Sequence, residues 1–510
     1  MPNMSNHIPA RRTPGSPARH AQDAAPIADA MRAYHERGML SFSIPAHGGD
    51  RGPRPEFAHW AGVEAARFDL PLNHGVDTRD YAWKVQSTAQ ELFAEAVGAK
   101  QTLFSTNGSS MSAHVAMMTV ARPGQTLVLG RNGHKSAFAA LVLSGARPVY
   151  LDPSYDEELA LALDPRAEDL ARVLDAHPEA RAAMITTPSY YGTSADIGAL
   201  AEVCHARGLP LVTDDAWGLD HELVAHPDLP AGALKQGSDL AIGSVHKTLT
   251  GLLQTSVLSV GSERIDTERL ELCFELEAST STSTLLLSSI DGARRQFVRE
   301  GRELLDRGLG SARLLRERLS AEVPELEVVA PERLAGHPGV AGVDPTHVLI
   351  ETASVGLTGY EADDWLREER LIEIELADHR RLMPLVTFAH GEDEIERLAR
   401  ALRDLVDERG GAGDAAAVPR VPTGQELRTE QVMLPRDAFF SPTEMVSPER
   451  ATGRIAAELI TPYPPGIPAI APGEAYTETI VDYLRELVDR GGFVEGAVDP
   501  SLQGMRVVAE

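Results

Sequence analysis

The sequence predicts an α/β protein whose large domain is built on a mostly parallel sheet. Two observations support this. Short apolar runs alternate with helix-length segments between residues 126 and 260, which is the pattern of consecutive βαβ units. The chain has 510 residues, whereas a usual domain has about 100–150. We therefore expect smaller domains in addition to the one that holds the sheet.

Six apolar runs are predicted as strands of this sheet. They are Thr126–Leu129, Pro148–Leu151, Ala183–Thr186, Leu209–Thr213, Leu240–Ile242 and Val257–Val260. The amphipathic segment 197–206 lies between two of these runs and is typical of a helix. Ligands of parallel sheets bind beyond the carboxyl ends of the strands, so the residues just after each run are the first candidates for a functional site.

The segments around this region predict the rest of the organisation. A short helix is expected over 28–34, a long helix over 291–318, and a smaller α+β unit with strands at 346–350 and 382–388 and a helix at 392–406. Glycine, alanine and proline dominate 409–424, which is typical of a linker. The expected division is a flexible tail at 1–25, an N-terminal arm at 26–85, a large domain at 86–325, a small domain at 326–408, the linker at 409–424 and a C-terminal domain at 425–510.

Charge and composition exclude several classes of partner. The chain has 48 Lys and Arg against 75 Asp and Glu, a net charge of −27, which argues against binding to nucleic acid or to an anionic membrane. No apolar stretch has the length of a membrane span, and residues 1–25 lack the apolar core of a signal peptide. Cys204 and Cys273 are too few for a disulfide framework. A cytoplasmic location is expected.

Lys247 is the first candidate for a catalytic residue. It is one of five lysines in an arginine-biased chain and lies in the segment Gly243–Thr248, just past a predicted strand. An amine can form a Schiff base with an aldehyde cofactor, which an arginine cannot do because its guanidinium stays protonated. A solvated loop lysine is the alternative on this segment alone.

A carboxylate follows the preceding strand. Asp214 comes directly after the run 209–213 and is followed by the small residue Ala216. A carboxylate at this point can pair with a pyridine nitrogen and keep it protonated, and a small side chain two residues on leaves room for a flat ring. A helix N-cap is the competing interpretation.

Two further segments add a phosphate site and an imidazole. The segment Thr106–Ser112 places glycine and serines ahead of an apolar helical run, an arrangement whose backbone N–H groups bind phosphate. His134 follows the strand 126–129 and is placed to stack on a cofactor ring. A plain N-cap and a structural histidine are the respective alternatives.

Taken together and in this order, these segments resemble the ornithine/lysine/arginine decarboxylase family, fold type I pyridoxal-phosphate enzymes of the aspartate aminotransferase superfamily. The resemblance runs from about residue 27 to the C-terminus. The chain is similar to the shorter subgroup of the family, which lacks a receiver-like N-terminal domain. Segments that carry it are 104–153, 187–192, 214–258, 463–468 and 472–474.

The resemblance implies a role for each matching residue. Lys247 would form the Schiff base with pyridoxal 5′-phosphate, Asp214 would pair with its pyridine nitrogen, and His134 would stack on its ring beside Ala216. The phosphate would be held by Ser109, Ser110, Ser244 and His246. Family dimers complete the phosphate site from the other subunit, for which Thr280 and Ser281 match. The implied assembly is a homodimer or a larger homo-oligomer with active sites at the interface.

The implied reaction is decarboxylation of a basic L-amino acid, namely arginine, lysine or ornithine, to the amine and CO2, with His246 or Lys247 as proton donor. Asp77, Asp80 and Glu474 are candidate partners for the distal charge of the substrate. The sequence departs from the shorter subgroup at Trp217, and from the family at 45–48 and 73–80, which border the substrate entrance in this family.

Those departures leave two alternatives open. The first is another reaction of the same cofactor on an amino acid, namely transamination, oxidative deamination or elimination. The second is a relative that binds the cofactor without catalysis, against which the retained Lys247, Asp214 and His134 argue. The proline-rich segment 461–468 is interpreted as a buried structural turn, with a polyproline docking ligand as the alternative.

Overall fold

The computed structural model describes residues 21–38, 42, 44–48, 55–70, 85–411, 423, 426–463 and 466–510. Asp77 and Asp80, two of the candidate substrate partners, lie outside these ranges, as do most of the predicted tail and linker. Within the described ranges, no helix combines the length and the apolar character that a bilayer span requires.

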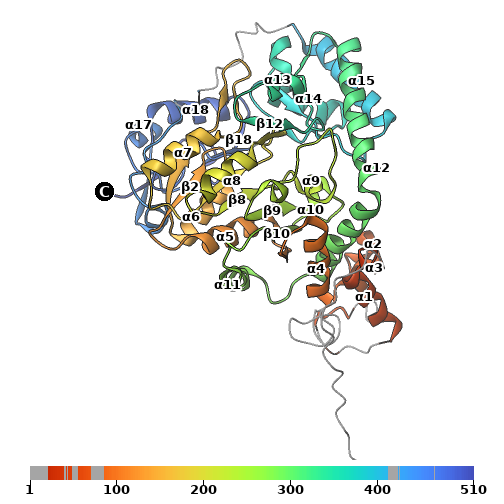
Figure 1. Ribbon diagram of the computed structural model, residues 1–510. Helices are drawn as coiled ribbons and strands as arrows, with labels where there is room; N and C mark the ends of the chain where they lie inside the picture. The colour runs from red at the N-terminus through yellow and green to blue at the C-terminus, as the bar shows by residue number, and fades with distance from the viewer. Residues whose placement is uncertain are drawn as a thin grey trace, which may run out of the picture.

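A seven-stranded sheet forms the centre of the large domain, with the strand order β1-β10-β9-β8-β6-β2-β3 (Figure 1). The five strands from β9 to β3 are parallel, and β10 pairs antiparallel with both β9 and β1, so that β1 at the edge runs in the same direction as the five. The strands are β1 (Gln101–Ser105), β2 (Thr126–Gly130), β3 (Arg147–Leu151), β6 (Ala183–Thr186), β8 (Leu211–Asp214), β9 (Leu240–Ser244) and β10 (Ser256–Val260). All six predicted strands are confirmed. β1 was not predicted, because polar residues at both of its ends interrupt the apolar run.

Helices cover both faces of the sheet, and the alternation of side chains along each strand explains why. Leu127 and Leu129 of β2 pack with α5 (Gly108–Val120), α6 (Lys135–Ser144) and α11 (Thr267–Glu277). Val128, which points to the opposite face, packs with α7 (Ala167–Ala176) and α8 (Ile197–His205). Both faces are therefore buried, as the apolar strands predict.

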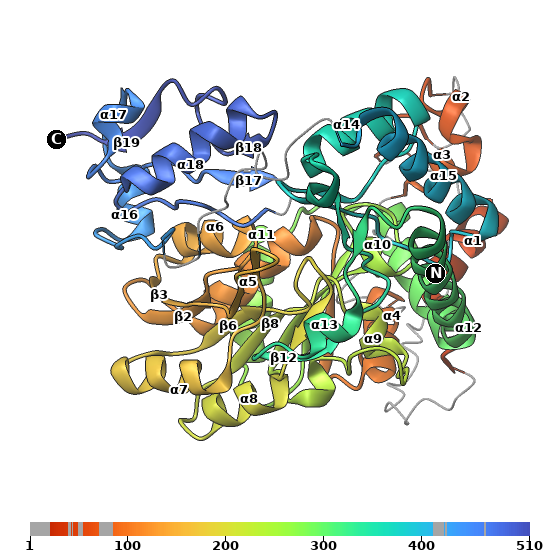
Figure 2. The ribbon, with the colours of Figure 1, turned by 90° about the horizontal axis from the view of Figure 1, so that it is seen from above.

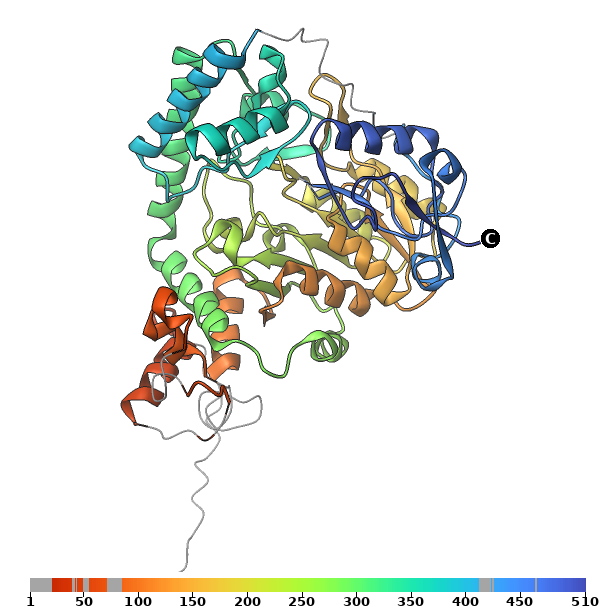
Figure 3. The same cartoon turned by 180° about the vertical axis from the view of Figure 1, so that it is seen from behind.

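A long helix joins the large domain to a smaller one. It is α12 (Thr284–Glu322), which runs along one side of the molecule in Figures 1 and 3. It begins seven residues before the predicted Asp291, because the Ser283 side chain caps it by accepting a hydrogen bond from the Leu286 N–H. The N-terminal helices α1 (Pro26–Glu36), α2 (Ala58–Ala61), α3 (Val63–Phe68) and α4 (Val85–Val97) lie at its N-terminal end.

The small domain packs α14 (Gly359–Arg370) and α15 (Glu392–Arg409) against a four-stranded antiparallel sheet, β11-β13-β15-β14. Its strands are β11 (Glu327–Val328), β13 (Ile350–Glu351), β14 (Leu376–Ala377) and β15 (Arg381–Met383). The predicted strand at 346–350 overlaps β13 only at Ile350, and the one at 382–388 overlaps β15 only at Leu382 and Met383. Pro384 cannot donate a ladder hydrogen bond, and β15 ends before it.

The C-terminal unit lies beside the small domain on the same side of the large sheet (Figure 2). It consists of α16 (Pro435–Phe440), β16 (Thr443–Val446), α17 (Pro448–Ala451), β17 (Thr461–Tyr463), α18 (Glu478–Asp489), β18 (Phe493–Glu495) and β19 (Met505–Val508). Its β17 and β18 pair with each other, as do β16 and β19. α16 packs on α6, and Ala471 joins the core of the large domain, so the unit is anchored to that domain.

Short elements complete the fold. They are β4 (Tyr155–Asp156), β5 (Leu161–Ala162), β7 (Thr193–Ala195), α9 (Leu219–Leu223), η2 (Leu234–Gln236), α10 (Val245–Thr248), α13 (Pro331–Ala335), β12 (Val340–Val343) and η3 (Thr352–Val355). The pairing of β7 with β12 ties the large domain to the segment between β11 and β13 of the small domain.

Candidate active site

The strand register brings the predicted site residues to one edge of the sheet. Ser105 of β1, Ser256 of β10 and Ser244 of β9 stand opposite one another, and Asp214 is the last residue of β8. His134 follows β2 at the same edge. Residues far apart in the sequence therefore meet where an α/β sheet binds its ligands.

Lys247 lies in α10, the short helix that follows β9 directly. Its Nζ is 4.2 Å from the centre of the Trp217 ring, a distance at which the ring face stabilises a cation. Burial lowers the pKa of Lys247, and the negative charges of Asp214 and Glu375 oppose that shift. The amine is thus closer to its nucleophilic, uncharged form than a surface lysine.

Asp214 is 4% exposed, and burial raises its pKa against the opposing effects of Lys247 and of a hydrogen bond from the Ala216 backbone N–H. Its Oδ1 has no hydrogen-bond partner among the described residues. A buried carboxylate oxygen without a partner is costly, so this atom is available for a charged donor such as a protonated pyridine nitrogen.

Hydroxyl groups form a connected cluster at the N-terminus of α5. Ser109 Oγ lies 2.5 Å from Ser244 Oγ and 3.3 Å from Ser256 Oγ, and Ser112 Oγ lies 2.9 Å from Ser256 Oγ. Ser110 is exposed on the first turn of the same helix. The first-turn N–H groups of α5 and these hydroxyls together provide donors that suit a phosphate.

The sequence did not single out Ser256 as a site residue. It begins an antiparallel strand, whereas the ligand-binding residues of a parallel sheet are expected to follow a strand. Because β10 runs opposite to β9, its first residue lies at the same edge as the last residue of β9. The signal that could have found it is a serine at the start of an apolar run just after Lys247.

His134 is held as a neutral ring. It caps α6 through Nδ1, which accepts a hydrogen bond from the Ser136 N–H at 3.3 Å, so the ring proton is on Nε2. Burial, assisted by the positive charge of Lys247, lowers its pKa to about 3. A neutral imidazole beside Lys247 suits stacking on an aromatic ring better than a charged one.

His246 also has a defined tautomer. Its Nδ1–H donates to the Thr255 carbonyl at 2.9 Å, and burial lowers its pKa. The proton of the neutral ring is therefore used in a structural hydrogen bond, and Nε2 is left as an acceptor.

Thr280 and Ser281 do not join the site of their own chain. Both are exposed in the segment between α11 and α12. Ser281 is hydrogen-bonded to its neighbour Ser279, with its N–H donating to Ser279 Oγ at 3.2 Å. Their role in a partner's site stays a prediction.

Glu474 was wrong as a candidate for the substrate's distal charge. It is 0% exposed, accepts a hydrogen bond from the Ala471 N–H at 2.7 Å and pairs with Arg131 at 3.5 Å. Its carboxylate joins the C-terminal unit to the large domain, so a substrate cannot reach it.

Glu375 is a carboxylate that the sequence analysis missed. It precedes β14 of the small domain and is exposed to solvent, yet surrounding protein raises its pKa while Lys247 and His347 oppose that rise. The carboxylate is therefore close enough to Lys247 for the two charges to interact. Its sequence context, a run of alternating Ile and Glu, shows no motif that would have identified it.

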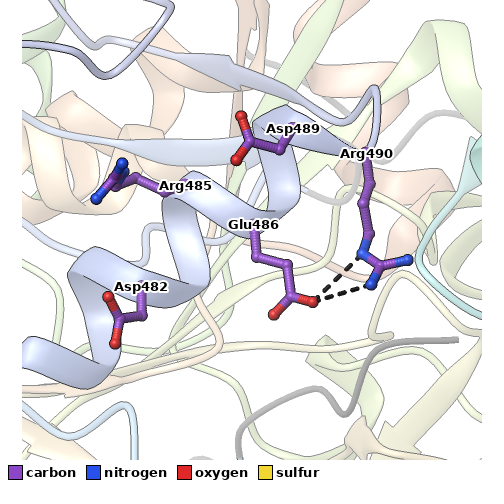
Figure 4. A pocket seen from close by; sticks show the side chains of 5 residues that line it. All are labelled: Asp482, Arg485, Glu486, Asp489 and Arg490. Carbon is purple, nitrogen blue, oxygen red and sulfur yellow. Dashed lines mark hydrogen bonds and ion pairs between the residues drawn. The ribbon is translucent and has the colours of Figure 1, made fainter. Parts of the chain in front are cut away.

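A separate hollow lies on the outer surface of the C-terminal unit (Figure 4). The side chains that line it come from α18 and from Arg490, the residue that follows the helix, and Glu486 binds Arg490 there at 3.2 Å. They are Asp482, Arg485, Glu486, Asp489 and Arg490. None of them belongs to the candidate active site.

The large sheet and the residues at this edge give the protein the architecture of the fold type I class. Residues 25–394 match the major domain of Orn/Lys/Arg decarboxylase, and residues 424–507 match its C-terminal domain. The chain therefore belongs to the Orn/Lys/Arg decarboxylase family and is an amino-acid decarboxylase. Members of this family are pyridoxal-phosphate enzymes that act on basic amino acids.

Relatives of known name agree with this assignment. The chain is 36% identical to an arginine decarboxylase of Halalkalibacterium halodurans, over 96% of this chain and 98% of that one. It is 33% identical to an arginine decarboxylase of Bacillus subtilis, over 96% and 99%. The fold resembles the constitutive lysine decarboxylase of Escherichia coli with a TM-score of 0.77 at 21% identity, over 96% of this chain and 82% of that one.

Proposed function

We propose that this enzyme uses pyridoxal 5′-phosphate to decarboxylate L-arginine, releasing CO2 and the corresponding amine. The observation that carries the cofactor assignment is the buried Asp214 Oδ1, which lacks a partner among the described residues and lies near Lys247. Likeness to two arginine decarboxylases above 30% identity over nearly the whole chain favours arginine among the basic amino acids.

The chain offers a group for each part of the cofactor. Lys247 would hold it through its amine, Asp214 would accept the pyridinium N–H, and His134 would cover one ring face while Ala216 leaves room on the other. The phosphate would be bound by Ser109, Ser110, Ser244 and Ser256, and by Thr280 and Ser281 of a partner subunit, whereas the acceptor Nε2 of neutral His246 offers no donor to it. The exposure of the last two on a loop is consistent with a homodimer.

When bound, the cofactor supplies an electron sink for the pair of electrons released as the bond between Cα and the carboxylate breaks. Asp214 maintains that sink by keeping the ring nitrogen protonated. The burial that lowers the pKa of Lys247 would also limit the hydration of the reacting carboxylate. Because His246 uses its ring proton in the bond to Thr255, we assign return of a proton to Cα to Nζ of Lys247.

Glu375 is proposed to bind the distal cation of the substrate. Asp77 and Asp80 lie outside the described residues, and Glu474 is buried in a structural ion pair. Glu375 is left as a carboxylate near Lys247 that also faces solvent. A guanidinium that enters from solvent would offer it two parallel N–H groups.

The test is CO2 release by the purified protein loaded with pyridoxal 5′-phosphate, measured with arginine, lysine, ornithine and the neutral analogue citrulline. Lys247→Ala serves as the blank. We expect release from arginine above all, and none in the blank. Release from lysine or ornithine instead would overturn the substrate assignment and keep the reaction. A keto acid and ammonia without CO2 would overturn the reaction.

A further inference from the structure

The C-terminal unit forms hydrogen bonds with the loop that carries His134, both before and after His134 in the sequence. Arg131 donates from Nη1 to the Pro468 carbonyl at 2.7 Å and from Nη2 to the Ala469 carbonyl at 3.1 Å. On the other side, the Lys135 N–H donates to the Gly466 carbonyl at 3.0 Å. The residues that flank His134 in sequence are thus fixed by a segment more than 300 positions later in the chain.

The backbone of Gly466 lies close to the His134 side chain. Its φ is +92°, and a Cβ built on it would lie 3.2 Å from Cδ2 of His134 and 3.3 Å from Cε2 of Tyr463. Only glycine combines this left-handed backbone with this proximity at low cost. The backbone at Gly466 therefore lies against the edge of the imidazole ring.

An ion pair joins the same two parts of the molecule. Nζ of Lys135, the residue after His134, binds the carboxylate of Glu495 at the end of β18. β18 pairs with β17, placing Thr461 opposite Glu495 and Tyr463 opposite Phe493. The β17–β18 ribbon, which lies near α6 in Figure 2, thus carries both Glu495 and the chain that leads to Gly466.

We propose that Gly466 and Glu495 are positioning residues for His134, so that the C-terminal unit sets the plane of the imidazole that covers the cofactor. This inference rests on the proposed function, because it concerns the same cofactor site. Its physical basis is that ring stacking depends on the relative orientation of the two planes. A side chain at a helix N-cap keeps that orientation only if packing locks it.

The glycine test compares Gly466→Ala with Gly453→Ala. Gly453 is in the same C-terminal unit, has a φ of +81° and has nothing within 4 Å of a built Cβ, so it reproduces the backbone strain without the approach to His134. We expect Gly466→Ala to weaken pyridoxal 5′-phosphate binding by about fivefold or more, through overpacking against His134. It should also change the circular dichroism of the bound cofactor in its visible band. Gly453→Ala should leave both unchanged.

The ion-pair test uses Glu495→Gln, with Glu449→Gln as its control. Glu449 is in the same unit and pairs only loosely with Arg485, at 3.5 Å. We expect Glu495→Gln to alter the visible dichroism and to lower kcat more than it raises KM, because His134 contacts cofactor rather than the distal end of the substrate. The double variant Lys135→Glu with Glu495→Lys should restore the wild-type dichroism.

The inference is overturned if Gly466→Ala and Glu495→Gln give the same cofactor dichroism and affinity as their controls while the wild type binds cofactor and releases CO2. A wild type that neither binds pyridoxal 5′-phosphate nor releases CO2 overturns the proposed function itself. The two failures are therefore distinguishable.

Discussion

Nζ of Lys247 lies 4.2 Å from the centre of the Trp217 ring, and that ring makes a T-shaped contact with His347 of the small domain, with 5.5 Å between ring centres. Trp217 thus links the candidate reactive lysine to the packing between the two domains. Its indole Nε1 has no hydrogen-bond partner among the described residues. Trp217 therefore contributes a ring face to the site and no structural hydrogen bond.

Trp217→Phe should lower kcat/KM. A phenyl ring keeps an apolar wall but attracts a cation less than indole does, so Lys247 is held less firmly in the position needed for cofactor attachment. We expect a loss of about 3- to 10-fold, corresponding to roughly 1 kcal/mol. Trp365→Phe is a matched control, because Trp365 packs with Arg370 at 4.3 Å in the small domain. Equal losses in both variants would argue against a specific role of Trp217.

Asp214→Asn should abolish most activity. The amide cannot keep a ring nitrogen protonated, and we expect kcat to fall at least about 100-fold, in line with the loss of a preorganised electrostatic group. Asp164→Asn is the control, since Asp164 is also buried and its carboxylate oxygens accept no hydrogen bond from the described residues. The measurement is kcat from steady-state CO2 release in both variants. Retention of activity in Asp214→Asn would contradict the proposed cofactor geometry.

Glu375→Gln should affect substrate binding rather than cofactor binding. Loss of a charge-assisted pair with the guanidinium predicts an increase of KM for arginine of about 10-fold or more, with cofactor affinity unchanged. Glu373→Gln, two residues away, controls for surface charge because Glu373 pairs with Arg367 at 3.4 Å. A lower kcat with an unchanged KM would contradict a role of Glu375 in binding the guanidinium of the substrate.

Thr280 and Ser281 can be tested by complementation between subunits. Lys247→Ala should be inactive alone, and the double variant Thr280→Ala with Ser281→Ala should be weakly active alone. Coexpressed hybrids should regain up to about a quarter of wild-type activity, because random pairing makes half of the dimers hybrids with one intact site each. Hybrids isolated by two different affinity tags that stay inactive would show that the segment does not act in trans.

Because of His221, the free energy of unfolding should fall as the pH rises into the alkaline range. Burial disfavours its charge, but Asp220 and Asp344 outweigh that effect and raise its pKa from 6.5 to about 9. A raised pKa stabilises the fold fully below pH 6.5, and this contribution is lost as pH rises through about 9. It amounts to at most about 3 kcal/mol.

Urea unfolding of wild type and His221→Gln at several pH values between 6 and 10 would measure this contribution. The variant should be less stable than wild type at the acid end, and the difference should shrink toward pH 10. His177→Gln, at a histidine that is 40% exposed, should shift stability little at any pH. A difference between wild type and His221→Gln that is constant with pH would contradict a charged His221.

Local pattern was sufficient for the six strands and for the placement of Lys247, Asp214 and His134 at one edge of the sheet. Strand polarity explains this, because parallel strands end at the same edge and each candidate follows such a strand. The strands of the small domain were less well predicted. Their short pairs depend on neighbours across the sheet, which apolar runs alone do not reveal.

The sequence by itself determined the family motifs, the fold class and the residue types needed for the chemistry. Only the tertiary structure decided which other side chains join them. The register of β10 on β9 brought Ser256 to the hydroxyl cluster, and domain packing placed Glu375 near Lys247, buried Glu474 with Arg131 and set Gly466 against His134. These contacts join residues distant in the chain, so no local spacing encodes them.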